Sequence, residues 1–339
     1  MSETWTLADL KTWTEKLLAS RRVVAPVAGP RGAVWSEIGD AGEILWDYGR
    51  TVDSPRSWLL PPVEPLFSYD LADNPPKIEE AALPSEPTVL LLLRPCDVAG
   101  LRALDGVMRW DFKDPAFEAR REATLLVSLA CAEPPAGQSC FCTAVGIDPR
   151  RAADADVSVE RLAGSGEARF DLHALTEAGQ AALSEAPRPA APAGPVVGRL
   201  PEPPVDLERA RAWMRGHFDD PAWEGIAQAC VGCGTCAFLC PSCHCFDVSD
   251  EGDWRRGVRL RFRDSCAFSH FTVHATGHNP RPRQANRYRQ RVYHKMIYYP
   301  DKFGPLLCTG CGRCIDACPA GVDLLEVLQD LASRPESKP

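Results

Sequence analysis

Two copies of one cysteine pattern near the C-terminal end constrain this chain more than any other feature. The first copy spans residues 230–241 (CVGCGTCAFLCP) and the second spans residues 308–319 (CTGCGRCIDACP). Both read C-x2-C-x2-C-x3-C-P, so each offers three closely spaced thiols and a fourth thiol that precedes a proline. Glycines within each run suit a loop whose backbone must approach a bound group closely. The repeated pattern predicts two metal-binding segments.

The spacing matches the ligand run of bacterial two-cluster ferredoxins, in which three thiolates hold one cluster and the fourth holds the other. We therefore expect two [4Fe–4S] clusters with crossed ligation. The first site would consist of Cys230, Cys233, Cys236 and Cys318, and the second site of Cys308, Cys311, Cys314 and Cys240. Tetrahedral zinc is the alternative, but zinc usually takes four ligands as separated pairs. Zinc would leave the triplet spacing and both prolines unexplained.

Length and cysteine usage bound the class of protein. The 339 residues suffice for two ordinary domains, and 15 cysteines in metal-type runs do not fit a small secreted disulfide scaffold. The N-terminus has no basic region followed by an apolar core, so we expect no signal peptide. The longest aliphatic run, residues 89–93, is too short to span a bilayer. We expect a cytoplasmic protein, because a reducing compartment keeps thiolates available for iron.

Charge is distributed unevenly along the chain. Residues 254–299 carry ten Arg and one Lys against a single Asp, a formal charge of +10 within a chain of −8, which leaves −18 for the rest. Cations near a cluster make it easier to reduce, because a four-thiolate cluster is itself anionic. Nucleic-acid binding is the rival explanation. We do not expect it, since the block lies between the two cysteine runs and contains no nucleic-acid motif.

Hydrophobic periodicity gives a coarse secondary structure. Helices are predicted over residues 6–21, 97–110, 172–184, 207–229 with a break near 220–221, and 324–332. Short strands and turns are predicted over residues 23–40, an extended Pro-rich segment over 54–69, and buried strands over 88–93 and 124–130. The order strand, helix, strand favours an α/β or α+β arrangement in the N-terminal half.

We expect an α+β chain with two domains joined by a linker. Residues 1–184 would form a mixed α/β domain, and residues 185–204, rich in Pro and Ala, a semi-rigid extended linker. Residues 205–339 would form an all-α ferredoxin domain, because helical patterns flank both cysteine runs and the runs are too far apart for a compact βαβ ferredoxin.

Four further cysteines lie in the N-terminal half. Cys96 follows the first buried strand, Cys131 follows the second, and Cys140 and Cys142 lie in the next loop. If the two strands are parallel neighbours, the first two thiols emerge at the same sheet edge. The four thiols form a candidate third site, for a third [4Fe–4S] cluster or, as an alternative, a zinc ion. The competing interpretation is that they are small buried hydrophobic residues.

Three cysteines and a group of histidines have less definite roles. Cys243, Cys245 and Cys266 are interpreted as packing beside the clusters. The histidines at 244, 270, 274, 278 and 294 are expected to donate hydrogen bonds to the backbone or to cluster sulfurs. The chain has no G-x-G-x-x-G after a strand, no P-loop and no nucleophile elbow, so the sequence offers no organic catalytic centre.

Two stretches, residues 236–247 (CAFLCPSCHCFD) and 264–295 with its GHNPRP and RYRQRVYHK segments, resemble the β subunit of soluble sulfhydrogenases. These are NAD(P)-linked [NiFe] hydrogenases able to reduce sulfur, and the electron-transfer subunit of anaerobic sulfite reductase is a near relative. The RPCD segment at 94–97, Cys131 and the CFC segment at 140–142 belong to the same resemblance, which covers most of the chain from about residue 54. Arg56 departs from it, because a lysine is expected there.

The resemblance implies an α-helical ferredoxin domain and an electron-transfer role without a catalytic centre in this chain. The leading hypothesis is an iron–sulfur subunit that passes single electrons between the small subunit of a cytoplasmic [NiFe] hydrogenase and a flavin subunit that reduces NAD(P)+. The alternatives are the electron-transfer subunit of an anaerobic sulfite reductase, and a non-redox zinc scaffold. The resemblance also implies that Cys96, Cys131, Cys140 and Cys142 are part of the family pattern.

Overall fold

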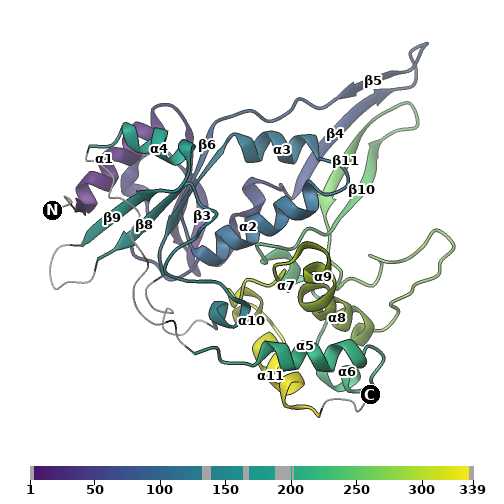
Figure 1. The fold of residues 1–339 in the computed structure, drawn as a ribbon. Coiled ribbons are helices and arrows are strands. Elements are labelled where there is room, and N and C mark those ends of the chain that lie inside the picture. The colour runs from purple at the N-terminus through teal and green to yellow at the C-terminus, as the bar shows by residue number, and fades with distance from the viewer. Residues whose placement is uncertain (1–3, 132–138, 163–167, 188–199, 201, 336–339) are drawn as a thin grey trace.

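The computed structural model describes residues 4–131, 139–162, 168–187, 200 and 202–335. These residues form a large sheet with helices on both faces, a smaller sheet that projects from it, and a group of helices beneath (Figure 1). The cysteine runs lie in the helical group, on the side that faces the large sheet.

The large sheet has seven strands in the order β1-β9-β8-β7-β6-β2-β3, and its central strands β2, β6, β7 and β8 are parallel. The strands are β1 Trp5–Thr6, β2 Arg22–Gly29, β3 Gly32–Ile38, β6 Thr88–Leu93, β7 Thr124–Leu129, β8 Val157–Arg161 and β9 Arg169–Ala174. The predicted buried strands are confirmed as β6 and β7. The predicted helix over 172–184 is wrong in its first part, because β9 pairs with β8 there and the helix α4 covers only Glu177–Ser184.

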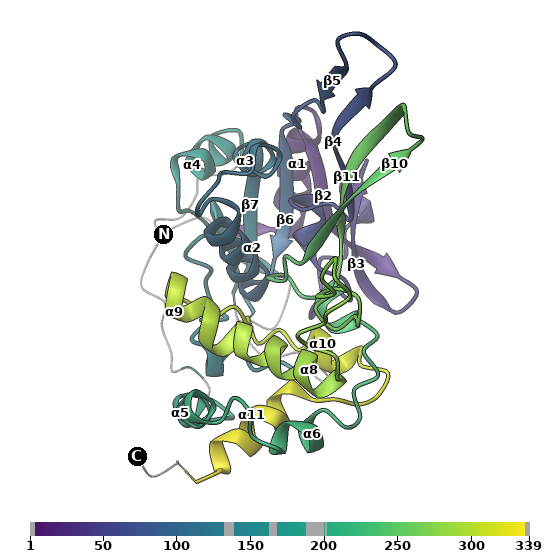
Figure 2. The ribbon, with the colours of Figure 1, turned by 90° about the vertical axis from the view of Figure 1, so that its right-hand side faces the viewer.

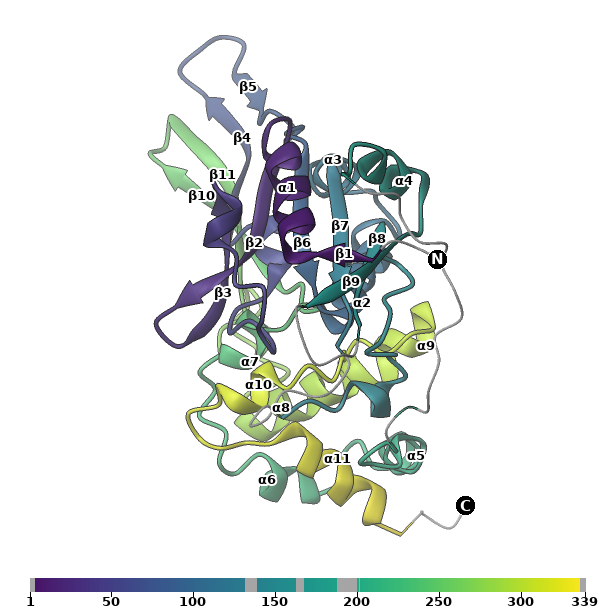
Figure 3. The ribbon, with the colours of Figure 1, turned by 90° about the vertical axis from the view of Figure 1, so that its left-hand side faces the viewer.

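Helices cover both faces of this sheet because its strands alternate their apolar side chains between two cores. Helices α1 (Leu7–Leu18) and α4 pack with Val23 and Val89 on one face (Figure 3). Helices α2 (Pro95–Met108) and α3 (Pro115–Glu122) pack with Val24 and Leu90 on the other (Figure 2).

Strand β6 contains an irregularity just before the segment that carries Cys96. Leu92 has a φ of +67°, and the pairing of β6 with β7 shifts register between Leu90 and Leu93. A branched residue with positive φ is strained, and such strain persists only where the surroundings fix it. Both Leu91 and Leu92 consequently pack on the α1 side of the sheet.

The smaller sheet joins segments from the two ends of the chain. Strands β4 (Val63–Asp70) and β5 (Lys77–Glu80) pair with β10 (Phe246–Gly252) and β11 (Arg256–Arg263) in the order β10-β11-β4-β5. The expectation of an all-α C-terminal part is therefore not confirmed. The sequence of β11 alternates Val258, Leu260 and Phe262 with arginines, which is the period of a strand.

The remaining helices surround the cysteine runs. They are α5 Leu207–Gly216, α6 Ala222–Ile226, α7 Thr235–Phe238, α8 Gln284–Tyr293, the π-helical turn η4 His294–Tyr298, α9 Tyr299–Phe303, α10 Arg313–Asp316 and α11 Leu324–Ser333. Short 3-10 turns occur at η1 Ala41–Glu43, η2 Pro55–Trp58 and η3 Cys142–Val145. Of the predicted linker, residues 188–199 and 201 lie outside the described residues. In the part of the chain that is described, no helix has the length and apolar character needed to cross a membrane.

Candidate iron–sulfur sites

The two cysteine runs fold in the same way. In each run a glycine with left-handed φ, +78° at Gly234 and +74° at Gly312, precedes a one-turn helix, α7 or α10. A second glycine, Gly232 or Gly310, has φ of +68° or +58° two residues earlier. Side chains rarely adopt these angles, so the glycines are required by the backbone path. The sequence repeat is thus a structural repeat, and α7 lies against α10.

The residues of the predicted first site line one small cavity of about 40 Å³. Its sulfur-bearing residues are Cys230, Cys233, Cys236, Cys318 and, from the second site, Cys314. The Nε2 of Gln284 donates to the Sγ of Cys230 at 3.1 Å. Cys233 is the exposed member of the fifteen cysteines, and a surface groove of about 1030 Å³ reaches both Cys233 and Cys318. The first site therefore borders solvent.

Cys240, the last thiol of the first run, lies with thiols of the second run. The pKa of the Cys314 thiol is raised to about 12, chiefly by burial and also by the nearby Cys308, Cys311 and Cys240, whereas Arg291 opposes the increase. Cys240, Cys308 and Cys311 are all buried. The structure thus brings together the residues of the predicted second site, away from solvent.

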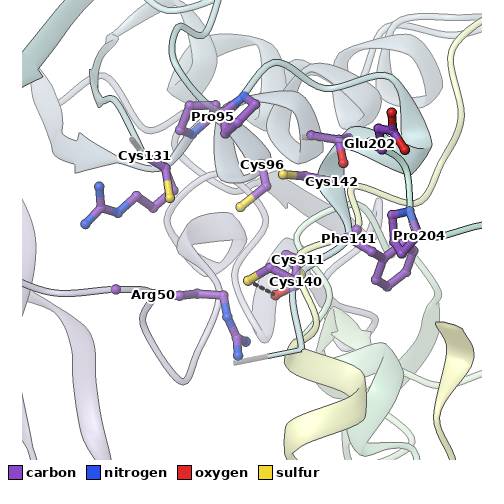
Figure 4. A pocket seen from close by; sticks show the side chains of 15 residues that line it. Arg50, Pro95, Cys96, Cys131, Cys140, Phe141, Cys142, Glu202, Pro204 and Cys311 are labelled. Atoms are coloured by element: carbon purple, nitrogen blue, oxygen red, sulfur yellow. Dashed lines mark hydrogen bonds between the residues drawn. The ribbon is translucent and has the colours of Figure 1, made fainter. Parts of the chain in front are cut away.

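The four N-terminal cysteines converge on a single cavity of about 240 Å³ (Figure 4). Cys96 lies in the first turn of α2, directly after β6, and Cys131 lies just beyond β7, so the parallel pairing of these strands brings both to one sheet edge. Cys140 and Cys142 enter from the next loop. The pKa of Cys142 is raised to about 11, chiefly by burial and also by the nearby Cys140 and Cys131. Binding a metal here would displace protons from these thiols.

The third site adjoins the second. Cys311 lines the same cavity as the four N-terminal thiols, and the Cys140 thiol donates to the Cys311 carbonyl at an Sγ···O distance of 3.7 Å. The backbone N–H of Phe141 donates to the carbonyl of Gly310 at 2.8 Å. The loop that carries Cys140 and Cys142 is therefore fastened to the second cysteine run.

Buried cations without carboxylate partners lie beside the thiols. Arg94, at the third site, is only 8% exposed and donates to the carbonyls of Ala130 and Tyr48, while its guanidinium stacks over the Tyr48 ring. Among the described residues no carboxylate lies within ion-pair distance of Arg94. Burying an unpaired charge is costly. The arrangement therefore suits a site whose thiolates carry negative charge.

Arg56, which departs from the family resemblance, has a definite role. It is 1% exposed and donates to the carbonyls of Ala237, Phe238 and Cys243. The first two carbonyls lie at the end of α7, where helix carbonyls lack partners within the helix. Arg56 thus links η2 of the N-terminal half to the helix that follows the first cysteine run, a role that the sequence did not predict.

Lys295, which the sequence pattern did not single out, also contacts the thiols. It lies in η4, and its Nζ donates to the Cys240 Sγ at 3.2 Å. π-Helical turns are rare and often occur at functional sites. Its place in the basic block was the signal that could have found it. Of that block, Arg291 also faces the thiols, whereas Arg259 pairs with Asp250 on the projecting sheet.

The remaining cysteines and two of the histidines, His244 and His294, lie near the candidate ligands. The histidines at 270, 274 and 278 are exposed, and no bond from their rings to a cysteine sulfur is seen among the described residues. Cys243 is buried with its Sγ 3.6 Å from Nη1 of Arg291, and Cys245 and Cys266 form a neighbouring pair of thiols. The rings of His244 and His294 are 5.3 Å apart. Nδ1 of His244 lies 3.1 Å from the Ser242 carbonyl, as expected for a histidine bonded to backbone.

Comparison with known proteins agrees with this geometry. Residues 229–322, which include both cysteine runs, match the family described as a 4Fe-4S dicluster domain. This part of the chain is therefore similar to iron–sulfur domains that carry two clusters. It is similar to sulfhydrogenase 2 subunit beta of Pyrococcus furiosus, with 27% identity over 330 residues that cover 91% of this chain and 92% of that protein. The resemblance to sulfhydrogenase β subunits is thus confirmed. No solved structure matches the chain.

Proposed function

We propose that this chain is the iron–sulfur subunit of a cytoplasmic [NiFe] hydrogenase or sulfur reductase complex. It would pass single electrons between the hydrogenase small subunit and a flavin subunit that reduces NAD(P)+. The observation that carries the proposal is the row of three thiol sets. Cys311 of the second site lines the cavity of the third, and Cys314 of the second lines the cavity of the first.

The residues present suit the clusters that the cysteine pattern implies. Cys230, Cys233, Cys236 and Cys318 would hold one [4Fe–4S] cluster, Cys308, Cys311, Cys314 and Cys240 a second, and Cys96, Cys131, Cys140 and Cys142 a third. Such clusters supply reversible single-electron transfer when bound. The chain's own contribution is to keep the second site buried, to leave the first site at the surface groove, and to fasten the third site to the second.

A zinc scaffold has weaker support. Among the described residues no three His, Cys, Asp or Glu side chains are arranged to hold a single metal ion. Convergence of four or more thiols around each cavity is better suited to a larger group than to one ion.

The experiment is anaerobic purification of the complex from its source, with iron and sulfide analysis of this chain and identification of its partners. We expect about twelve irons and about twelve sulfides per chain, since each cubane has four of each. Co-purification of nickel and flavin subunits supports the hydrogenase assignment. Co-purification of a sirohaem subunit would point to a sulfite reductase, and zinc without sulfide would reject the proposal.

A further inference from the structure

The segment from Cys240 to Cys243 is enclosed by three buried cations. Lys295 is 2% exposed, and its Nζ donates to the Cys240 Sγ at 3.2 Å and to the Ser242 Oγ at 3.3 Å. Arg291 is 5% exposed and donates to the Cys236 carbonyl at 3.0 Å as well as approaching Cys243. Arg56 donates to the Cys243 carbonyl.

None of these three cations has a carboxylate within ion-pair distance among the described residues. Two other buried cations of this chain do pair with acids: Arg313 with Asp97, and Arg261 with Glu64. A buried cation without a partner costs much more free energy than a paired one, because an uncompensated buried charge is strongly destabilising. The groups that can supply negative charge beside Lys295 and Arg291 are thiolates.

The other two sites have weaker positive surroundings. At the first site the sulfur of Cys230 accepts from Gln284, which is neutral, and Cys233 is open to solvent, which screens charge. Arg291 also lines this cavity and donates to the Cys236 carbonyl, but among the described residues no lysine donates to a sulfur there. At the third site Arg50 is paired with Asp316, which leaves Arg94 as the cation without a carboxylate among the described residues. The second site therefore differs from both neighbours in charge and in exclusion of water.

We propose that Lys295, supported by Arg291 and Arg56, gives the second site the highest reduction potential of the three, so that the middle of the row is where an electron resides. This inference rests on the proposed function. The reason is electrostatic: a cation and a hydrogen bond at a ligand sulfur favour the more negative, reduced state of a cluster. Lys295 is a positioning residue here, because it acts through Cys240.

The test is an EPR-monitored redox titration of the cluster-loaded protein. In Lys295→Met, one signal should move to lower potential while the others stay in place, and that signal should be the first reduced in the wild type. Lys295→Arg keeps the charge and should restore most of the potential. Lys302→Met is the matched control and should leave all the reduction potentials unchanged. Lys302 lies in α9, the helix that follows η4, and its exposed side chain lies over the Trp110 ring.

A second pair of variants covers the case in which Lys295→Met does not bind iron. Arg291 and Arg289 lie on the same helix, but Arg289 turns away to pair with Asp219. Because Arg291 borders both the first and the second site, Arg291→Gln should lower the potentials of these two sites and leave that of the third unchanged. Arg289→Gln should lower none of them. Equal shifts of all signals, or loss of iron from both Lys295→Met and Arg291→Gln but not Arg289→Gln, would overturn the proposal. If the wild type lacks iron and sulfide the proposed function fails, whereas full iron with a different order of potentials refutes this inference alone.

Discussion

The guanidinium of Arg313 donates to the carboxylate of Asp97 at an Nη1···Oδ1 distance of 2.6 Å, and neither side chain has any exposed surface. Arg313 lies between two ligands of the second site, and Asp97 follows Cys96 of the third. Two further bonds, from Arg313 to the carbonyl and hydroxyl of Thr51, complete its contacts. One buried ion pair thus ties the second cysteine run to helix α2.

Removal of one partner from this pair should be costly. Asp97→Asn leaves the Arg313 charge buried, and we expect a loss of about 3–5 kcal/mol in the free energy of unfolding. Anaerobic urea unfolding followed by tryptophan fluorescence measures it. Arg334→Met breaks the exposed pair with Asp330 and should cost less than about 0.5 kcal/mol. Equal effects of the two variants would contradict a buried role for the pair.

Gly310 should be required for the contact between the second and third sites. Its φ is +58°, and an added Cβ would lie 2.6 Å from the backbone N of Cys142 and the carbonyl carbon of Phe141. Gly310→Ala should therefore displace the loop and reduce the iron content. Gly321→Ala is the matched control, because Gly321 has a φ of +65° but open space around its Cβ position. That variant should cost only about 1–2 kcal/mol of backbone strain and keep its iron.

Substitution of Cys142 tests the third site directly. Cys142→Ser should lower the iron content from about twelve to about eight atoms per chain, with the other two clusters intact by EPR. Cys243→Ser is the control, because Cys243 is buried beside Arg291 but is not a proposed ligand. An unchanged iron count in Cys142→Ser, together with about eight irons in the wild type, would favour simple packing of the N-terminal thiols.

If each cysteine run supplies ligands to both clusters, loss of one ligand should affect both clusters. Cys318 lies with the thiols of the first site but belongs to the second run, and its Sγ accepts from the N–H of Val322 at 3.3 Å. Cys318→Ala should damage both clusters and lower the thermal stability of the C-terminal part, since metal binding and folding are coupled. Loss of one cluster with the second unaffected would instead indicate that each run closes on its own sulfurs.

Two partly buried histidines predict a pH dependence. Burial lowers the pKa of His244 to about 4 and that of His294 to about 3, against an ordinary value of 6.5. The unfolded chain therefore binds more protons below about pH 6.5, and stability should fall as the pH drops from there toward about 4. Between about pH 7.5 and about 5.5 each histidine should account for about 1 kcal/mol. His294→Gln should flatten this slope in urea unfolding, and His274→Gln, in an exposed loop, should not.

Much of this arrangement was predictable because its signals are local. The two cysteine runs specify ligand order by spacing alone, and the strands before Cys96 and Cys131 were visible as short apolar runs. The sequence analysis assumed, but did not predict, that β6 and β7 are parallel neighbours. Their parallel pairing brings Cys96 and Cys131 to the same sheet edge. The position of Cys140 and Cys142 near this edge could be inferred because their loop follows Cys131 in the chain.

The interactions that were not predicted depend on distant segments. Residues 246–263 carry a strand period, but the flanking helical patterns favoured an all-α interpretation, and their pairing with β4 could not be inferred from spacing. The same applies to Arg56 with the end of α7, and to Lys295 with Cys240. Each is a contact between residues far apart in sequence, and a charged residue is expected at the surface until its burial is known.

The pairing of β4 with β11 has a consequence for the timing of assembly. Asp70 pairs with Arg256, and Cys96 shares its cavity with Cys311, so the early segments must wait for their partners until the second cysteine run has been synthesised. Contacts of such long sequence separation form slowly and leave strand edges exposed meanwhile. Iron delivered before that point would find incomplete sites, so assembly of the second and third sites must follow synthesis of the second cysteine run.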